Sequence, residues 1–245
     1  SNSLSIVEHI TYLILRLISS TIAIFPRSLS LFLGSYFGKL IKLTLTKRKD
    51  VALQNIKYSF PKLNHYQHLK ILDKTYQHFG KVFFEFLRMP YLNQTKIKNI
   101  INFDINTQLL LKSNKSGIIL TGHYGNWEMI QAAFNLNNIN LISVAQIQKN
   151  KGANKFFTWI RNKTNTKIIF KNEPTIKMIN TLKKNYIGLA SDQYAGKSGV
   201  PTIFFGKETL SPIGATFFHI KTKAPIFVGF CKLMPDQSYN ISFKK

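Results

Sequence analysis

The stretch Gly117-Ile-Ile-Leu-Thr-Gly-His-Tyr-Gly-Asn-Trp-Glu128 decides the fold prediction for this 245-residue chain. Its apolar first residues predict a buried strand that ends at Gly122. His123 follows at once, and after Gly125 the stretch has the composition of a helix start with an acid in its first turn. A strand that passes through a glycine-rich turn into a helix is typical of open α/β sheets, which place their functional groups at such strand ends.

His123 and Glu128 are the candidates for a catalytic pair in this stretch. A histidine can act as a general base near neutral pH, and a carboxylate can orient its ring. The two residues are five positions apart, so they cannot share one face of a single helix. With His123 in the loop and Glu128 on the helix, Gly122 and Gly125 allow the backbone to bring them together. The alternative is a histidine that merely packs at a strand end.

Strand-like and helix-like segments alternate after about residue 107. This alternation predicts an α/β fold with a mixed, mostly parallel sheet flanked by helices. A long amphipathic helix precedes it, with apolar residues at steps of three and four between Asn64 and Pro90. The predicted strands are 117–121, 141–145, 167–170, 186–190, 202–205, 226–230 and 239–243, and the predicted helices among them are 127–136, 154–162, 175–184 and 212–223.

The N-terminal residues 4–45 differ from the rest. Residues 10–25 are almost wholly apolar apart from Arg16, and a second apolar stretch, residues 29–45, is followed by the basic cluster Lys47-Arg48-Lys49. A helix that spans a bilayer needs about 20 apolar residues, and the first apolar run is shorter. Apolar helices bordered by Lys and Arg favour an interfacial or single-pass membrane anchor over a buried helical hairpin. We therefore divide the chain into a membrane-associated helical segment, residues 1–45, and an α/β domain, residues 46–245.

The composition limits the class of function. Lys and Arg number 34 against 10 acids, and the resulting charge of +24 favours anionic partners such as lipid phosphates, nucleic acid or an acidic protein. Cys231 is the only cysteine, which excludes an intrachain disulfide or a cysteine-based zinc site and indicates a reducing compartment. The P-loop, nucleophile-elbow and dinucleotide-binding motifs are absent. No ribonucleoprotein signature or basic recognition helix is present, which argues against nucleic acid as a partner.

Several blocks of the sequence resemble the lipid A late acyltransferases, the lauroyl and myristoyl transferases of outer-membrane biogenesis. The segment Gly122–Glu128 is similar to the His-x4-Asp/Glu motif of that family, and Arg161 falls where the family has a functionally important arginine. The likeness extends over nearly the whole chain. The further blocks that carry it are Arg48–Ile56 with Phe60-Pro61, Ser191–Gly196, Val200–Gly206, Ser211–Gly214 and Lys223–Val228.

The resemblance implies a glycerolipid-acyltransferase-like fold and an enzyme that moves a fatty acyl chain from acyl carrier protein to a hydroxyl of an anionic lipid A precursor. It implies a location at the cytoplasmic face of the inner membrane, and the expected reaction needs no cofactor and no metal. His123 is the expected general base and Glu128 the residue that orients it. No Ser, Cys or Lys adjoins His123, so we expect direct transfer without an acyl-enzyme.

The remaining site candidates are expected to bind substrate or the reaction's oxyanion. Backbone N–H groups at the predicted helix start and the Arg161 guanidinium are the candidate oxyanion donors. Asp192 is expected to organise Arg161 or the acceptor, unless it only caps a turn. Phe205 and Gly206, followed by Lys207, could contact a lipid headgroup, or the Phe205 side chain could lie in the core. The full set of candidates is Gly125, Asn126, Arg161, Asp192, Phe205, Gly206 and Lys207.

The chain departs from the family pattern at three points. Tyr194 stands where a second acid is often found, and Lys207 stands where the family usually has an arginine. The chain also ends just after a predicted strand, where the family continues into a helix, so we expect the domain to lack its C-terminal end. The alternatives are an acyltransferase for another phospholipid or glycolipid acceptor, or a basic membrane- or RNA-binding protein without catalysis.

Overall fold

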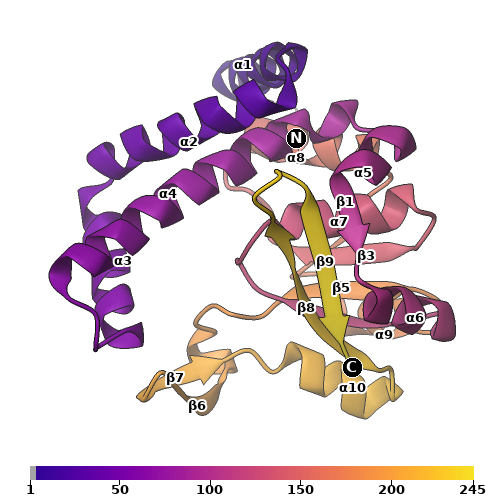
Figure 1. Cartoon of the computed structure of the whole chain (residues 1–245). Helices are drawn as coiled ribbons and strands as arrows, with labels where there is room; N and C mark the ends of the chain where they lie inside the picture. Colours follow the sequence, from indigo (N-terminus) through magenta and orange to yellow (C-terminus); the bar gives the residue numbers. More distant parts are fainter. Residues whose placement is uncertain (1–3) are drawn as a thin grey trace. The chain divides into compact units, whose positions relative to one another are not determined.

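The computed structural model describes residues 4–245, which form two compact units (Figure 1). The first unit contains residues 4–17, 89–202 and 208–245, and the second contains residues 18–88 and 203–207. This division differs from the predicted boundary at residue 45, because residues 46–88 group with the helix before them rather than with the sheet. The chain passes from one unit to the other within helix α1 (Ile6–Ile24), and residues 203–207 join the second unit although the residues on either side belong to the first.

The first unit is built on a seven-stranded sheet with the order β1-β9-β8-β2-β5-β3-β4. Neighbouring strands run parallel except for β8 and β9, the antiparallel pair drawn in yellow in Figure 1. The predicted mixed, mostly parallel sheet is confirmed. The strands are β1 (Ile101–Phe103), β2 (Gly117–Thr121), β3 (Leu141–Ala145), β4 (Lys167–Phe170), β5 (Tyr186–Ala190), β8 (Ile226–Leu233) and β9 (Tyr239–Lys244).

Helices cover both faces of this sheet because successive strand residues point to opposite sides. Tyr186 of β5 contacts Phe134 on one face, while its neighbour Ile187 belongs to the apolar core on the other face. Helix α7 (Trp127–Leu136) supplies Phe134, and helices α9 (Thr175–Thr181) and α10 (Gly214–Thr222) cover the opposite face. The other helices of this unit are α5 (Gln94–Ile100), α6 (Ile105–Ser113) and α8 (Lys151–Lys163).

The predicted strand 202–205 lies outside the main sheet. It forms part of β6 (Val200–Phe204), which pairs with β7 (Lys207–Ser211) in a separate two-stranded hairpin. Pro201 has no N–H to donate and is therefore disfavoured in a central strand. Phe205 and Gly206 both have positive φ, 48° and 74°, which turns the chain back in a two-residue loop.

The second unit is a helical layer made of α2 (Arg27–Thr44), α3 (Thr46–Ser59) and α4 (His65–Arg88). Glycines bring α2 and α4 into backbone contact. A Cβ on Gly38 would lie 2.1 Å from the carbonyl oxygen of Tyr76, and one on Gly80 would lie 2.0 Å from that of Gly34. Small residues four positions apart allow helices to pack this closely. The α4 helix occupies most of the predicted segment 64–90.

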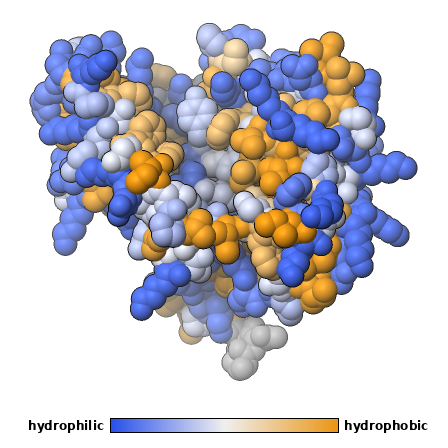
Figure 2. Space-filling model, turned by 90° about the horizontal axis from the view of Figure 1, so that it is seen from below, coloured by the Kyte–Doolittle hydropathy of each residue, from blue (hydrophilic) through white to orange (hydrophobic). Residues whose placement is uncertain are grey.

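Helix α1 is the one helix among residues 4–245 that is long and apolar enough to cross a membrane. Its first half packs on α8, where the Arg16 guanidinium lies 3.9 Å above the Trp159 ring. The other side of the helix is exposed, with Ile10, Leu13 and Leu17 between 49% and 68% accessible. Patches of apolar residues, orange in Figure 2, lie among hydrophilic ones on the face shown there. An exposed apolar stripe of this kind fits a lipid surface better than a soluble core.

Candidate active site

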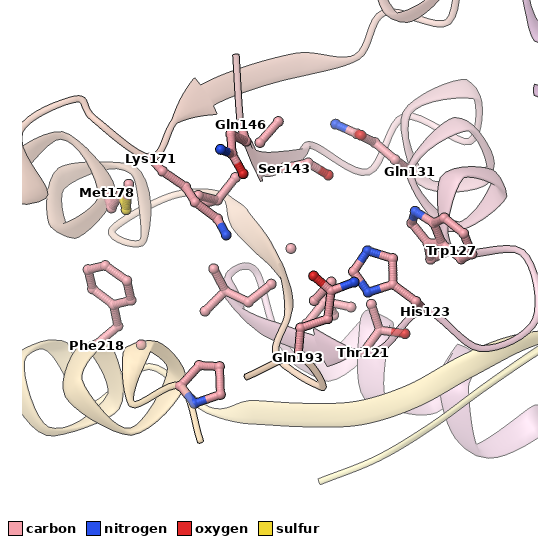
Figure 3. Close-up of a pocket in the computed structure, with 18 of the residues that line it drawn as sticks. Thr121, His123, Trp127, Gln131, Ser143, Gln146, Lys171, Met178, Gln193 and Phe218 are labelled. Carbon is pink, nitrogen blue, oxygen red and sulfur yellow. The ribbon is translucent and has the colours of Figure 1, made fainter. Parts of the chain in front are cut away.

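A cavity of about 800 Å³ opens at the carboxyl ends of β2, β3 and β5 in the first unit. Open α/β sheets bind ligands at this edge. Figure 3 shows His123, Thr121 and Trp127 at one end of the cavity and Met178 and Phe218 at the other. The wall between them is mixed, with polar side chains such as Gln146 and Lys171 beside apolar ones (Figure 3). Its apolar residues include Ile119, Val144, Leu189, Ile213 and Phe217.

The carboxylate of Asp192 holds His123 through two hydrogen bonds. The His123 backbone N–H donates to Oδ2 at 2.7 Å, and the ring Nδ1 lies 2.8 Å from Oδ1. An ionised carboxylate can only accept, so the proton of the neutral imidazole lies on Nδ1. The Nε2 lone pair is then free to take a proton. The Trp127 ring packs against the imidazole at a centroid distance of 4.8 Å.

The sheet creates the His123–Asp192 contact. Thr121, the last residue of β2, lies opposite Ala190, the last residue of the parallel neighbour β5, so the residues that follow both strands emerge together. Gly122 leaves room for the acid, because a Cβ at this position would lie 2.9 Å from Asp192 Cγ. A side chain at position 122 would therefore displace the carboxylate that holds the imidazole.

Glu128 has a different partner from the one the sequence predicted. Its Oε1 lies 3.3 Å from Nη2 of Arg161, and both side chains are largely buried. The acid that contacts His123 is Asp192, whereas the sequence paired His123 with Glu128 and expected Asp192 to organise Arg161 or the acceptor. Arg161 stands in the last turn of α8, and its guanidinium lies 5.7 Å from the Phe157 ring. All four residues nevertheless gather at one site, and His123, Glu128 and Arg161 line the cavity.

Asn126 fixes the start of α7. Its side-chain oxygen accepts the Met129 N–H, its amide donates to the Tyr239 hydroxyl, and its own backbone N–H donates to the Cys231 carbonyl. The backbone N–H of Asn126 is therefore occupied by the Cys231 carbonyl in this structure. Gly125 has φ +65° and approaches the same Cys231 carbonyl too closely for a Cβ. These two residues hold the loop that carries His123.

Thr121 is a residue of the site that the sequence analysis did not select. It lines the cavity two positions before His123 (Figure 3). Its hydroxyl is buried and has no hydrogen-bond partner among the residues that the structure describes. A buried polar group without a partner costs free energy, so such groups are rare unless a ligand completes them. Its only sequence signal is its place at the end of a strand before the histidine.

Phe205, Gly206 and Lys207 do not line the cavity. They form the turn of the β6–β7 hairpin and the first residue of β7. Phe205 is 57% exposed, so the core alternative for this residue is excluded. Lys207 lies with its Nζ 3.3 Å above the Tyr58 ring of α3. Within residues 4–245, no three His, Cys, Asp or Glu side chains gather as metal ligands do.

The model of a family described as bacterial lipid A biosynthesis acyltransferase matches residues 2–244, which is nearly the whole chain. No curated protein gives a significant match.

Proposed function

We propose, since the chain belongs to the bacterial lipid A biosynthesis acyltransferase family, that it transfers a fatty acyl chain from acyl carrier protein to a hydroxyl of a lipid A precursor. The observation that carries the proposal is the His123 imidazole, held by Asp192 beside a cavity that both apolar and polar side chains line. This combination offers a base for a hydroxyl and space for an alkyl chain. The cavity volume is within the usual range for a bound organic ligand.

The reaction begins when His123 Nε2 takes the proton of the acceptor hydroxyl as its oxygen attacks the thioester carbonyl. Asp192 fixes the ring tautomer and stabilises the imidazolium that forms. When the tetrahedral intermediate collapses, the carbon–sulfur bond breaks and the imidazolium returns its proton to the leaving thiolate. The protein ends in its starting state, and the acyl group is joined to the acceptor oxygen.

Direct transfer is supported by the scarcity of nucleophiles beside the base. The only cysteine, Cys231, is fully buried in β8, and no Ser or Lys adjoins His123 in sequence. Incubation with acyl donor alone would test this step. We expect no covalent acyl-protein, and a stable mass gain on the protein would overturn direct transfer.

Two groups are proposed to meet the charge that develops during transfer. Arg161, held by Glu128 at the cavity wall, is the cation for the tetrahedral oxyanion or for a phosphate of the acceptor. The unpartnered Thr121 hydroxyl is the second donor or acceptor, and contact with the reacting groups would complete its hydrogen bonding. In this scheme Glu128 positions Arg161 instead of His123.

Charge and exposed surface support the proposed partners and location. A net charge of +24 speeds the encounter with an acidic acyl carrier protein and with a phosphorylated lipid. The exposed apolar stripe of α1 would rest in the cytoplasmic face of the inner membrane, where both substrates occur. We place the enzyme there as an interfacial or single-pass protein.

The proposal is tested by incubating the detergent-solubilised protein with acyl carrier proteins that carry chains of several lengths and with a tetra-acylated lipid A precursor. Mass spectrometry should show the added acyl group with the wild type and with His65→Ala, an exposed histidine of α4. The gain should vanish with His123→Ala. A gain that persists in His123→Ala would exclude this base, and no gain with any protein would exclude this acceptor.

A further inference from the structure

The tip of the β6–β7 hairpin presents a cluster of large apolar side chains to solvent. Ile203 is 69% exposed, Phe204 62% and Phe205 57%. The two phenylalanine rings contact each other edge to face at a centroid distance of 4.6 Å. Adjacent exposed aromatic rings at the end of a hairpin are unusual, since Phe is among the residues most often buried. Such a cluster indicates a surface that is covered when the protein is at work.

The backbone conformation at the hairpin tip is unfavourable for a residue such as Phe. Phe205 and Gly206 are the central residues of a two-residue turn, and both have left-handed φ values of 48° and 74°. Turns of this kind are usually made with Asn-Gly or Asp-Gly, because a bulky side chain is strained at positive φ. Burial does not repay that strain at Phe205, which is mostly exposed. A strained backbone that no packing contact compensates indicates that the residue serves a function rather than stability.

The charges beside the tip suit an anionic lipid surface. Lys207 follows the turn directly, and its ammonium group rests on the Tyr58 ring. Lys197 lies just before β6, and Glu208 is the one acid of the hairpin. Aromatic rings enter the boundary between headgroups and acyl chains, while lysines extend to the phosphates at the same depth. An apolar tip bordered by lysines therefore matches a bilayer that contains anionic lipid.

The base of the hairpin is tied to the cavity. The Ala195 N–H donates to the Leu210 carbonyl at 2.9 Å, and Ala195 lines the cavity wall. Thr202 and Ser211 are joined across the hairpin base by their hydroxyls at 2.7 Å. The next residues along the chain, Pro212 and Ile213, line the cavity as well. The strands of the hairpin thus run from the cavity wall to the apolar tip.

We propose that residues 203–207 are a membrane-inserting tip, with Phe204 and Phe205 in the interfacial layer of an anionic bilayer and Lys207 at its phosphates. This bilayer contact is separate from the α1 stripe and stands whatever lipid the enzyme acylates.

The first test places a fluorophore at the tip of the full-length protein. Phe204→Cys can be labelled with an environment-sensitive nitrobenzoxadiazole group, since the native Cys231 is buried and unreactive. With phosphatidylcholine–phosphatidylglycerol vesicles we expect a blue shift of the emission and quenching by spin-labelled acyl chains. Asn140→Cys, an exposed position before β3, should keep its aqueous spectrum when labelled in the same way.

Three results would overturn the proposal. The tip label could keep an aqueous spectrum while the protein sediments with vesicles, or the protein could fail to sediment at all. The shift could also appear without vesicles, which would assign the tip to contact between two copies of the chain. None of these readouts involves acyl transfer, so the outcome is independent of the proposed reaction.

The second test separates bilayer contact from a structural role. Phe205→Asn puts a residue that tolerates left-handed φ at the strained position, so we expect a melting temperature at least as high as that of the wild type. Because the proposal places the Phe205 side chain in the bilayer, its loss should weaken vesicle binding about 10-fold. A lower melting temperature with unchanged vesicle binding would make Phe205 structural and overturn the proposal.

Discussion

Thr121 carries a buried hydroxyl that the fold itself does not use, which makes it a direct probe of the site. Thr121→Val has nearly the same shape and removes the unpartnered group. We expect the variant to gain about 1 kcal/mol in unfolding free energy, because an unsatisfied buried polar group costs about 1–3 kcal/mol. If the hydroxyl meets the reacting groups, kcat should fall about 10²-fold. Urea titration and steady-state kinetics measure the two effects.

An unchanged kcat in Thr121→Val would remove this hydroxyl from the proposed reaction. Ser143→Ala offers a matched control, since Ser143 also carries a hydroxyl at the cavity wall. This substitution should leave kcat close to the wild-type value, because Ser143 lies on β3 instead of the strand that leads to His123.

The sequence singled out His123, Glu128, Arg161 and Asp192 as site candidates, but it paired His123 with Glu128, whereas in the structure His123 contacts Asp192 and Glu128 contacts Arg161. The reason is physical. Glu128 is near His123 along the chain, whereas Asp192 is 69 residues away and reaches His123 only because β5 lies beside β2. Strand order is a property of the whole sheet, so local spacing could not choose between the two acids. The resemblance to a family supplied Asp192 and Arg161 but not their contacts.

The α2–α4 pair is the element whose stability depends most plainly on glycine. A Cβ on Gly38 would lie 2.1 Å from the Tyr76 carbonyl oxygen, which belongs to backbone and cannot rotate away. We expect Gly38→Val to destabilise the helical unit by about 3 kcal/mol, the upper end of overpacking costs. Thermal unfolding measures this effect.

Gly214→Ala is the matched control for Gly38→Val. Its nearest neighbour, a Leu189 methyl group, would lie 3.9 Å from the new Cβ in ordinary contact. We expect no loss of stability, because Ala favours a helix more than Gly does. Equal melting temperatures for Gly38→Val and the wild type would show that α2 and α4 do not pack through these glycines.

Glu85 of α4 gives the helical unit a pH dependence. Burial raises the pKa of the Glu85 carboxyl above its ordinary value of 4.5, and Arg27 and Arg88 offset only part of this shift. Because the folded pKa is raised, Glu85 adds stability that is fully present below pH 4.5 and is lost as pH rises through the folded pKa. Glu85→Gln cannot titrate, so the unfolding free energy of the wild type should fall relative to this variant over that range.

Urea unfolding of the wild type and of Glu85→Gln across that pH range tests the pH dependence that Glu85 gives to the unfolding free energy. Two parallel stability curves would contradict it. Glu85→Ala serves as a second variant, because it removes the partner of the Arg27 Nε, which lies 2.9 Å from Glu85 Oε1. We expect it to be less stable than Glu85→Gln at every pH, since it removes the acceptor of the Arg27 Nε–H and leaves a space where the side chain was.

The long periodic elements were predictable, and the short ones were not. Strand β2 and helix α7 have the predicted bounds because a continuous apolar run and an amphipathic repeat fix them locally. Strand β1 has three residues, too few to show a period, and it exists only because β9 pairs with it. The β6–β7 hairpin was taken for one strand, since its turn uses Phe205 where a small residue is expected.

For the molecule as a whole, the net charge and the exposed apolar surface both support the proposed location at an anionic membrane. The charge of +24 is fixed by composition alone, while the exposure of α1 and of the hairpin tip emerges only from the folded chain. From the sequence alone, both α1 and the hairpin tip could have belonged to the buried core. Their exposure explains why a mean composition that suits a soluble protein can belong to a lipid-processing enzyme.

The measurement that tests the central claim most directly is kcat for acyl transfer by Asp192→Asn. The substitution keeps the size of the side chain but removes the charge that holds the Nδ1 proton and stabilises the imidazolium. The account predicts a fall in kcat of about 10³-fold or more, with the fold intact by circular dichroism. A kcat equal to that of the wild type would contradict the pairing of His123 with Asp192 as the catalytic unit.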